Sequence, residues 1–261
     1  MITVLETIYS TAKLQMKEAV TRPTFRFCLL IQPIIYSLIT YKMFINSGHD
    51  NFVAYTVLGT GILTLWSCIC FSSAGDIERE RYMGTLQVIY NTPTNFKVII
   101  LGKILGNTML GLLPFFISFA FVRLFLGGDM YIKDPMAFGI SMIITIASFM
   151  GISMLFAAVF TLSRSSRILM NCIEYPVFIL CGILFPIEIL PKWTIPLSYI
   201  LSPTWAVKLL RLSVEGLEGN DIFCKYFGIL TTITIIYFIL SNILFKIIDN
   251  KTRIKATLGV V

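Results

Sequence analysis

Long apolar runs separated by short polar segments dominate the sequence. Six runs are near the length of roughly 20 residues that a helix needs to cross a bilayer core. Each run is continuously apolar, whereas the strands of a membrane barrel alternate between apolar and polar positions over about 10 residues. The pattern therefore predicts an all-α membrane protein with six transmembrane helices, at about residues 27–45, 52–74, 98–127, 135–162, 168–187 and 222–248.

The first 22 residues are too polar to cross the membrane, but they have a helical period. Their apolar side chains recur at steps of three and four residues on the face opposite the charged ones (Leu5, Ile8, Ala12, Met16 and Ala19 against Lys13, Lys17 and Glu18). This pattern predicts an amphipathic interfacial helix on the inner membrane surface. Packing of the same helix against another subunit is the alternative.

The segment between the fifth and sixth runs, residues 188–221, is rich in proline and contains Trp193 and Trp205. Residues 190–200 are too short and too interrupted to cross a bilayer, and tryptophan favours the membrane interface. We therefore expect re-entrant helices between spans five and six. Lys208 and Arg211 share a helix face there and could meet lipid headgroups or an anionic substrate, although snorkelling is the simpler interpretation.

The distribution of Lys and Arg predicts the orientation. With the N-terminus inside the cell, 14 of the 21 basic residues fall in cytoplasmic segments and 7 fall in outer ones. Basic residues concentrate in cytoplasmic loops. We therefore expect a multi-pass protein of the cell membrane with both termini in the cytoplasm, a transmembrane domain over residues 23–250 and a cytoplasmic tail over residues 251–261.

Composition agrees with a membrane protein and excludes several other classes. Hydrophobic residues make up 56% of the chain and charged residues 13%, and the mean hydropathy is +0.83. Soluble domains carry about 25% charged residues. The net charge of +7 comes from basic clusters between apolar runs. Nucleic acid recognition needs a continuous basic stripe, so we expect no nucleic acid partner.

Motifs for enzymatic chemistry are missing. The chain has one histidine, His49, and its six cysteines lie in or beside apolar runs, so neither a histidine-based metal site nor a redox pair is indicated. The sequence contains no G-x-x-x-x-G-K-[ST] and therefore no P-loop for ATP. Motifs of serine hydrolases and zinc proteases are also absent. These absences predict no catalytic residues, no metal and no cofactor on this chain.

The polar segment between the second and third spans, residues 76–97, is the largest on the predicted cytoplasmic side. Four consecutive charges, Glu78 to Arg81, precede Gly84, which permits a sharp change of direction, and Pro93 ends the local helix. Apolar residues between these points give the segment an amphipathic character. Its composition fits a docking site for a partner as well as it fits a solvated connection.

A few polar residues lie inside the predicted spans. Glu174 in the fifth span stands out, because a carboxylate within a membrane is costly and usually functional. Asn171 lies three residues earlier on the same helix face, and the two could line a polar path. The alternative is that Glu174 pairs with Arg164 or Arg167. Asn107 in the third span is a weaker candidate, because a hydrogen bond between helices explains it equally well.

Taken in order, these features resemble the type-2 ABC transporter permeases (ABC-2 type). The resemblance comes from E-R-E-R-x-x-G-T-L and T-P after the second span, G-x-x-F-P at Gly182–Pro186, L-P at Leu190–Pro191, P-T-W-A-V at Pro203–Val207, and Arg211. It covers nearly the whole chain. One departure is Gln87, where many relatives carry an acidic residue.

The resemblance implies the permease subunit of an ATP-driven exporter, with two permeases and two separate ATP-binding-cassette subunits. ATP and magnesium would then bind to the ATPase subunits, and membrane lipid would surround the permeases. Residues 1–22 would be the interfacial helix, and the ATPase-docking residues would be Glu78, Arg79, Glu80, Arg81, Gly84, Thr85 and Leu86.

The substrate path would pass between the two permeases near spans two and five, with Asn107, Asn171 and Glu174 as its candidate residues. Drugs, peptides, lipids and polysaccharides are all carried by such permeases, and the second permease could be an identical or a related chain. The alternatives are a secondary transporter, whose ion coupling needs more intramembrane charges than this chain has, a membrane-embedded enzyme, and a non-transporting sensor or immunity protein.

Overall fold

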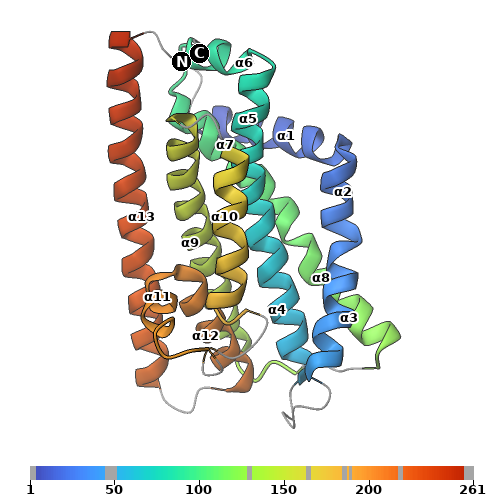
Figure 1. The fold of residues 1–261 in the computed structure, drawn as a ribbon. Helices are drawn as coiled ribbons and strands as arrows, with labels where there is room; N and C mark the ends of the chain where they lie inside the picture. Colours follow the sequence, from blue (N-terminus) through green and yellow to red (C-terminus); the bar gives the residue numbers. More distant parts are fainter. Residues whose placement is uncertain are drawn as a thin grey trace.

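The computed structural model describes residues 4–44, 52–127, 131–162, 166–183, 187, 190–216 and 220–255. All the regular elements in these residues are helices, packed side by side as a bundle with shorter helices at its two ends (Figure 1). The prediction of an all-α membrane protein is therefore confirmed.

The described chain passes along the bundle six times (Figure 1). Five passes contain a stretch long and apolar enough to cross a membrane, and α10, with 15 residues, is shorter than these. A 15-residue helix is about 22 Å long, and residues 184–186 of the predicted fifth span lie outside the described residues, so the sixth span stays a prediction. The passes are α2 (Pro23–Leu30) with α3 (Gln32–Phe44), α4 (Phe52–Trp66) with the π-helix η1 (Ser67–Phe71) and α5 (Ser72–Tyr82), α7 (Phe96–Gly111) with α8 (Leu113–Phe125), α9 (Pro135–Leu162), α10 (Ser166–Leu180) and α13 (Asn220–Lys255).

Two passes are broken where proline interrupts the helical hydrogen bonds. The first breaks at Ile31, before Pro33, and the third breaks at Leu112, before Pro114. Proline has no N–H to donate and clashes with the preceding turn. The predicted span 98–127 is therefore two helices with a bend between them rather than one continuous helix.

Different short helices lie at the two ends of the bundle. At one end, α1 (Val4–Thr21) runs across the long helices and packs against α7, and α6 (Thr85–Tyr90) and the last turns of α13 lie at the same end of the bundle (Figure 1). At the opposite end lie α11 (Ile195–Ile200) and α12 (Ser202–Glu215). These two helices replace a simple connection between α10 and α13, as the proline-rich segment predicts.

Most of the predicted polar segment 76–97 is helical rather than a loop. α5 continues the second pass to Tyr82, α6 follows after the corner at Met83 and Gly84, and α7 begins at Phe96. Glu and Arg are good helix formers, so the four charges extend the helix beyond the apolar run. Gly84 has a φ of 73°, which ends the helix and turns the chain.

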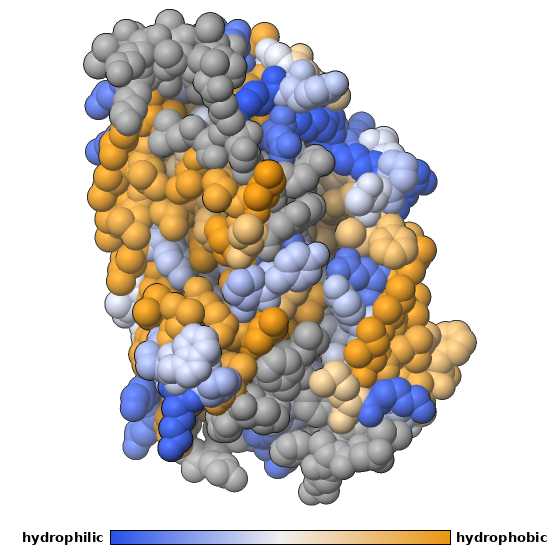
Figure 2. Space-filling model, in the orientation of Figure 1, coloured by the Kyte–Doolittle hydropathy of each residue, from blue (hydrophilic) through white to orange (hydrophobic). Residues whose placement is uncertain are grey.

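The core lies between α4, α9 and the helices after α10. Trp66 and Phe149 are fully buried there, with their rings edge to face at 5.3 Å between centroids. α12 packs against α4, α9 and α13, and its Leu209 and Leu210 are buried. Figure 2 shows apolar side chains along the outer surface of α13, which suits a surface that faces lipid.

Candidate functional site

The interfacial helix α1 rests on α7 at two glycines. A Cβ at Gly106 would lie 2.6 Å from the carbonyl oxygen of Ala12, and one at Gly102 would lie 2.9 Å from that of Ile8. Both distances are too short for any side chain, so the spacing of four between the glycines allows the two backbones to approach closely. α1 thus packs on its own chain through part of the face that the sequence assigned to the membrane surface.

A buried polar network joins α1 to the second and third passes. The Asp76 carboxylate of α5 is 4% exposed. It accepts hydrogen bonds from Arg22 Nη1 at 2.6 Å, from Gln15 Nε2 at 2.5 Å and from Asn107 Nδ2 at 3.1 Å. Gln15 also donates to Asn107 Oδ1 at 3.0 Å. The network satisfies polar groups that would otherwise be costly to bury.

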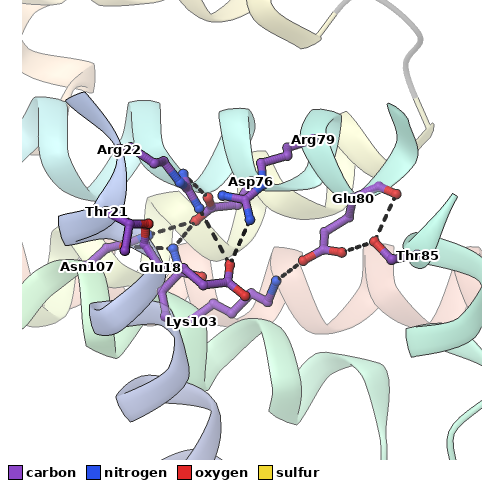
Figure 3. A network of polar contacts seen from close by, with 10 residues as sticks. Glu18, Thr21, Arg22, Asp76, Arg79, Glu80, Thr85, Lys103 and Asn107 are labelled. Carbon is purple, nitrogen blue, oxygen red and sulfur yellow. Dashed lines mark hydrogen bonds and ion pairs between the residues drawn. The ribbon is translucent and has the colours of Figure 1, made fainter. Parts of the chain in front are cut away.

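A row of ion pairs continues from this network along α5 (Figure 3). Arg79 contacts Glu18 of α1 at 3.2 Å. Glu80, the next residue and one turn of the helix after Asp76, pairs with Lys103 of α7 and also accepts a hydrogen bond from the hydroxyl of Thr85. The charged part of α5 is therefore held to α1 on one side and to α7 and α6 on the other.

Arg81 ties the same part of α5 to the end of α9. Its guanidinium donates to the backbone carbonyls of Phe160 at 3.0 Å and Thr161 at 2.7 Å. The last four carbonyls of a helix have no partner within the helix, and a cation there also favours the helix dipole. A displacement of α5 would therefore pull on α1, α7 and α9 together.

Three of the predicted docking residues have partners within the chain that hold the corner between α5 and α6, and the docking role itself stays a prediction. Arg79, Glu80 and Arg81 have the intramolecular partners given above, Glu78 lies half-buried on α5, and Leu86 is buried in the core. Three apolar or aromatic side chains of the corner and α6 are exposed: Tyr82 is 93% exposed, Met83 60% and Val88 66%. The sequence reasoning missed Tyr82, although its position two residues before Gly84 was the available signal.

The three candidate path residues lie in different surroundings. Asn107 is fully buried in the network with Asp76, which matches the interhelical hydrogen bond considered as its alternative role. Glu174 of α10 accepts a hydrogen bond of 2.6 Å from the Ser67 hydroxyl in η1. Asn171 is on α10, but its side chain, like those of Arg164 and Arg167, lies outside the described residues.

The Glu174 contact brings the second pass and α10 together at the π-helix. The described residues contain no cluster of His, Cys, Asp and Glu that could hold a metal ion.

Comparison with family models matches residues 6–214 to the ABC-2 type transporter family. The match covers nearly all of the chain from α1 to α12 and leaves out the whole of α13. No protein matched in the search of curated proteins.

Proposed function

Because the chain belongs to the ABC-2 type transporter family, it is a multi-pass membrane component of an ABC transporter, and we propose that it is the permease subunit of an ATP-driven exporter. In this proposal two permeases, identical or related, enclose the path, and two separate ATP-binding-cassette subunits bind ATP and magnesium. The protein lies in the cell membrane with α1, α6 and the C-terminal tail on the cytoplasmic side. The family match, which covers most of the chain, supports the transport role.

The observation that carries the ATPase-docking part of the proposal is the corner between α5 and α6. It presents Tyr82, Met83 and Val88 to solvent. Its inner side is fixed by Glu80 to α7 and by Arg81 to α9. Aromatic side chains and methionine are enriched where proteins bind one another. A partner that pushes on this corner would move several long helices at once.

The transport cycle follows from this connection. ATP binding would bring two cassette subunits together, and their movement would displace the corners of the two permeases. The helices would then change between inward-open and outward-open arrangements, an equilibrium that the nucleotide biases. The ion pairs of Glu18, Arg79, Glu80 and Lys103 would transmit the displacement from α5 to α1 and α7.

The docking proposal can be tested with Met83→Asp/Val88→Asp. Both positions are exposed, and a charge introduced at an exposed position has little effect on stability. We therefore expect the variant permease to fold normally. Co-purification with a cassette ATPase co-expressed from a neighbouring gene, and the ATPase activity of the complex, should fall at least tenfold.

The matched control is Met136→Asp, at an 82% exposed position at the opposite end of the bundle. It adds the same kind of charge and should leave the complex intact. Unchanged co-purification and activity in the Met83/Val88 variant would show that the ATPase binds elsewhere.

A further inference from the structure

We propose that the Glu174 carboxylate binds the positive charge of a lipophilic organic cation, which is the class of substrate this transporter carries. The proposal builds on the transport role proposed above and adds the chemistry of the substrate. It starts from the one hydrogen bond that the structure gives this carboxylate, from Ser67 Oγ to Glu174 Oε1 at 2.6 Å.

Both partners lie within the apolar stretches of their passes. The helical pass that contains Ser67 extends from Val53 to Tyr82. Its uncharged part ends before Asp76, so Ser67 stands 14 residues after Val53 and nine residues before Asp76. Glu174 is in the second half of α10, six residues before Leu180. A carboxylate at this depth is expensive to keep, and such groups usually mark the route of a substrate or an ion.

Three carboxylates of α1 and α5 have basic partners. Asp76 pairs with Arg22, Glu80 with Lys103, and Glu18 with Arg79. Among the described side chains Glu174 has the Ser67 hydroxyl and no ion pair. This hydroxyl orients one oxygen of the carboxylate, and within the described side chains no cation compensates its negative charge in this poorly solvated place. A cation that enters from the membrane would supply the missing charge.

The π-helix fixes the hydroxyl in position. η1 interrupts the α-helical hydrogen bonds from Ser67 to Phe71, and Ser153 Oγ of α9 donates to the Ile69 carbonyl at 3.0 Å. A single π turn within a longer helix frequently occurs at a functional site. Since the backbone of η1 is held by α9, the Ser67 side chain presents a fixed donor to α10.

Two aromatic residues follow Glu174 on α10. Tyr175 is 65% exposed, and its ring meets that of Phe178 edge to face with 6.5 Å between centroids. Aromatic faces attract cations and also accept apolar groups. Carboxylate and aromatic rings together suit a molecule that is both positively charged and lipophilic, and the same carboxylate repels an anion of equal shape.

Two ions of nearly equal size and opposite charge, tetraphenylphosphonium and tetraphenylborate, make a direct test. Binding of each would be measured to the purified chain in phosphatidylcholine nanodiscs, after subtraction of binding to empty nanodiscs. The dissociation constant for tetraphenylphosphonium should rise at least tenfold in Glu174→Gln, which corresponds to about 1.4 kcal/mol. Binding of tetraphenylborate should stay equal or become tighter, which also shows that the variant is folded.

Asp221→Asn is the matched control, because Asp221 is exposed in the first turn of α13 and its loss should leave both constants unchanged. The proposal would be overturned by an unchanged tetraphenylphosphonium constant in Glu174→Gln, or by no specific binding to the wild-type chain. Weakened binding of both ions would also overturn it, because that result indicates a structural role. The assay contains no ATPase subunit, so failure of the proposed docking would leave its outcome unaffected.

Discussion

Arg22→Gln removes the cation that contacts the buried Asp76 carboxylate at 2.6 Å. The change leaves Asp76 with the amide donors of Gln15 and Asn107, which form hydrogen bonds but carry no charge. The free energy of unfolding should therefore fall, and α1 should be held less firmly to the bundle.

The size of the loss follows from the burial of the two partners. Removal of one partner from a buried ion pair costs about 3–5 kcal/mol. Asp76 is 4% exposed, but the Arg22 side chain is 25% exposed and water already solvates part of it. The two amides also continue to donate to the carboxylate. We therefore expect a loss of about 2–3 kcal/mol, at or just below the lower limit of this range.

Equilibrium unfolding in mixed micelles of a mild detergent and SDS would measure this loss. Trypsin cleavage at the exposed Lys13 and Lys17 of α1 should also become faster, because α1 detaches more often. Arg26→Gln is the control: Arg26 lies one turn later on α2 and is exposed, so its replacement should change stability by less than about 0.5 kcal/mol.

The double variant Arg22→Gln/Asp76→Asn decides whether the pair explains the loss. In the double variant the carboxylate is replaced as well, so the Arg22 change no longer leaves a buried charge without its cation. The loss of unfolding free energy in the double variant should therefore be smaller, by at least about 1 kcal/mol, than the sum of the losses in the two single variants. A loss below about 0.5 kcal/mol in Arg22→Gln, or additive losses in the double variant, would refute the reasoning.

Two other predictions concern the same end of the molecule. Gly106→Ala should weaken the packing of α1 on α7 and lower the free energy of unfolding by at least about 1–2 kcal/mol, because its Cβ would meet the backbone of Ala12 at 2.6 Å. Gly139→Ala is the control: no atom lies within 4 Å of its Cβ, so it should be neutral or slightly stabilising in the same unfolding assay. Equal losses in the two variants would contradict the close packing of α1 on α7. Arg81→Gln should cost about 1.5–3 kcal/mol, because it takes a charged donor from two carbonyls at the end of α9, and hydrogen exchange should accelerate in the last turn of α9. Arg79→Gln should cost only about 0–1 kcal/mol, since its pair with Glu18 is about one-third exposed; similar losses in the two arginine variants would show that the α9 contact is unimportant.

The sequence alone determined the fold class, most spans and the family. Hydrophobic runs of about 20 residues have one stable solution in lipid, a helix that satisfies its own backbone hydrogen bonds. The positions of the spans therefore follow from the pattern, whatever the neighbouring helices do. The same holds for Gly84, whose corner follows from a backbone conformation that glycine adopts easily. The count of six spans, the orientation and the roles of the docking and path residues stay predictions.

Only the tertiary structure decided which polar residues are structural. Glu80 and Arg81 look like a solvated charge cluster in the sequence, but partners distant in the chain, Lys103 and the end of α9, hold them in place. The spacing of Gly102 and Gly106 is common in membrane helices and does not predict a partner. The structure shows that the backbone of α1 packs closely against both glycines. Hydrophobic periodicity reports which positions avoid water. It does not report which two helices meet, so the partners of Asp76 and the contact between Ser67 and Glu174 depend on packing between segments far apart in sequence.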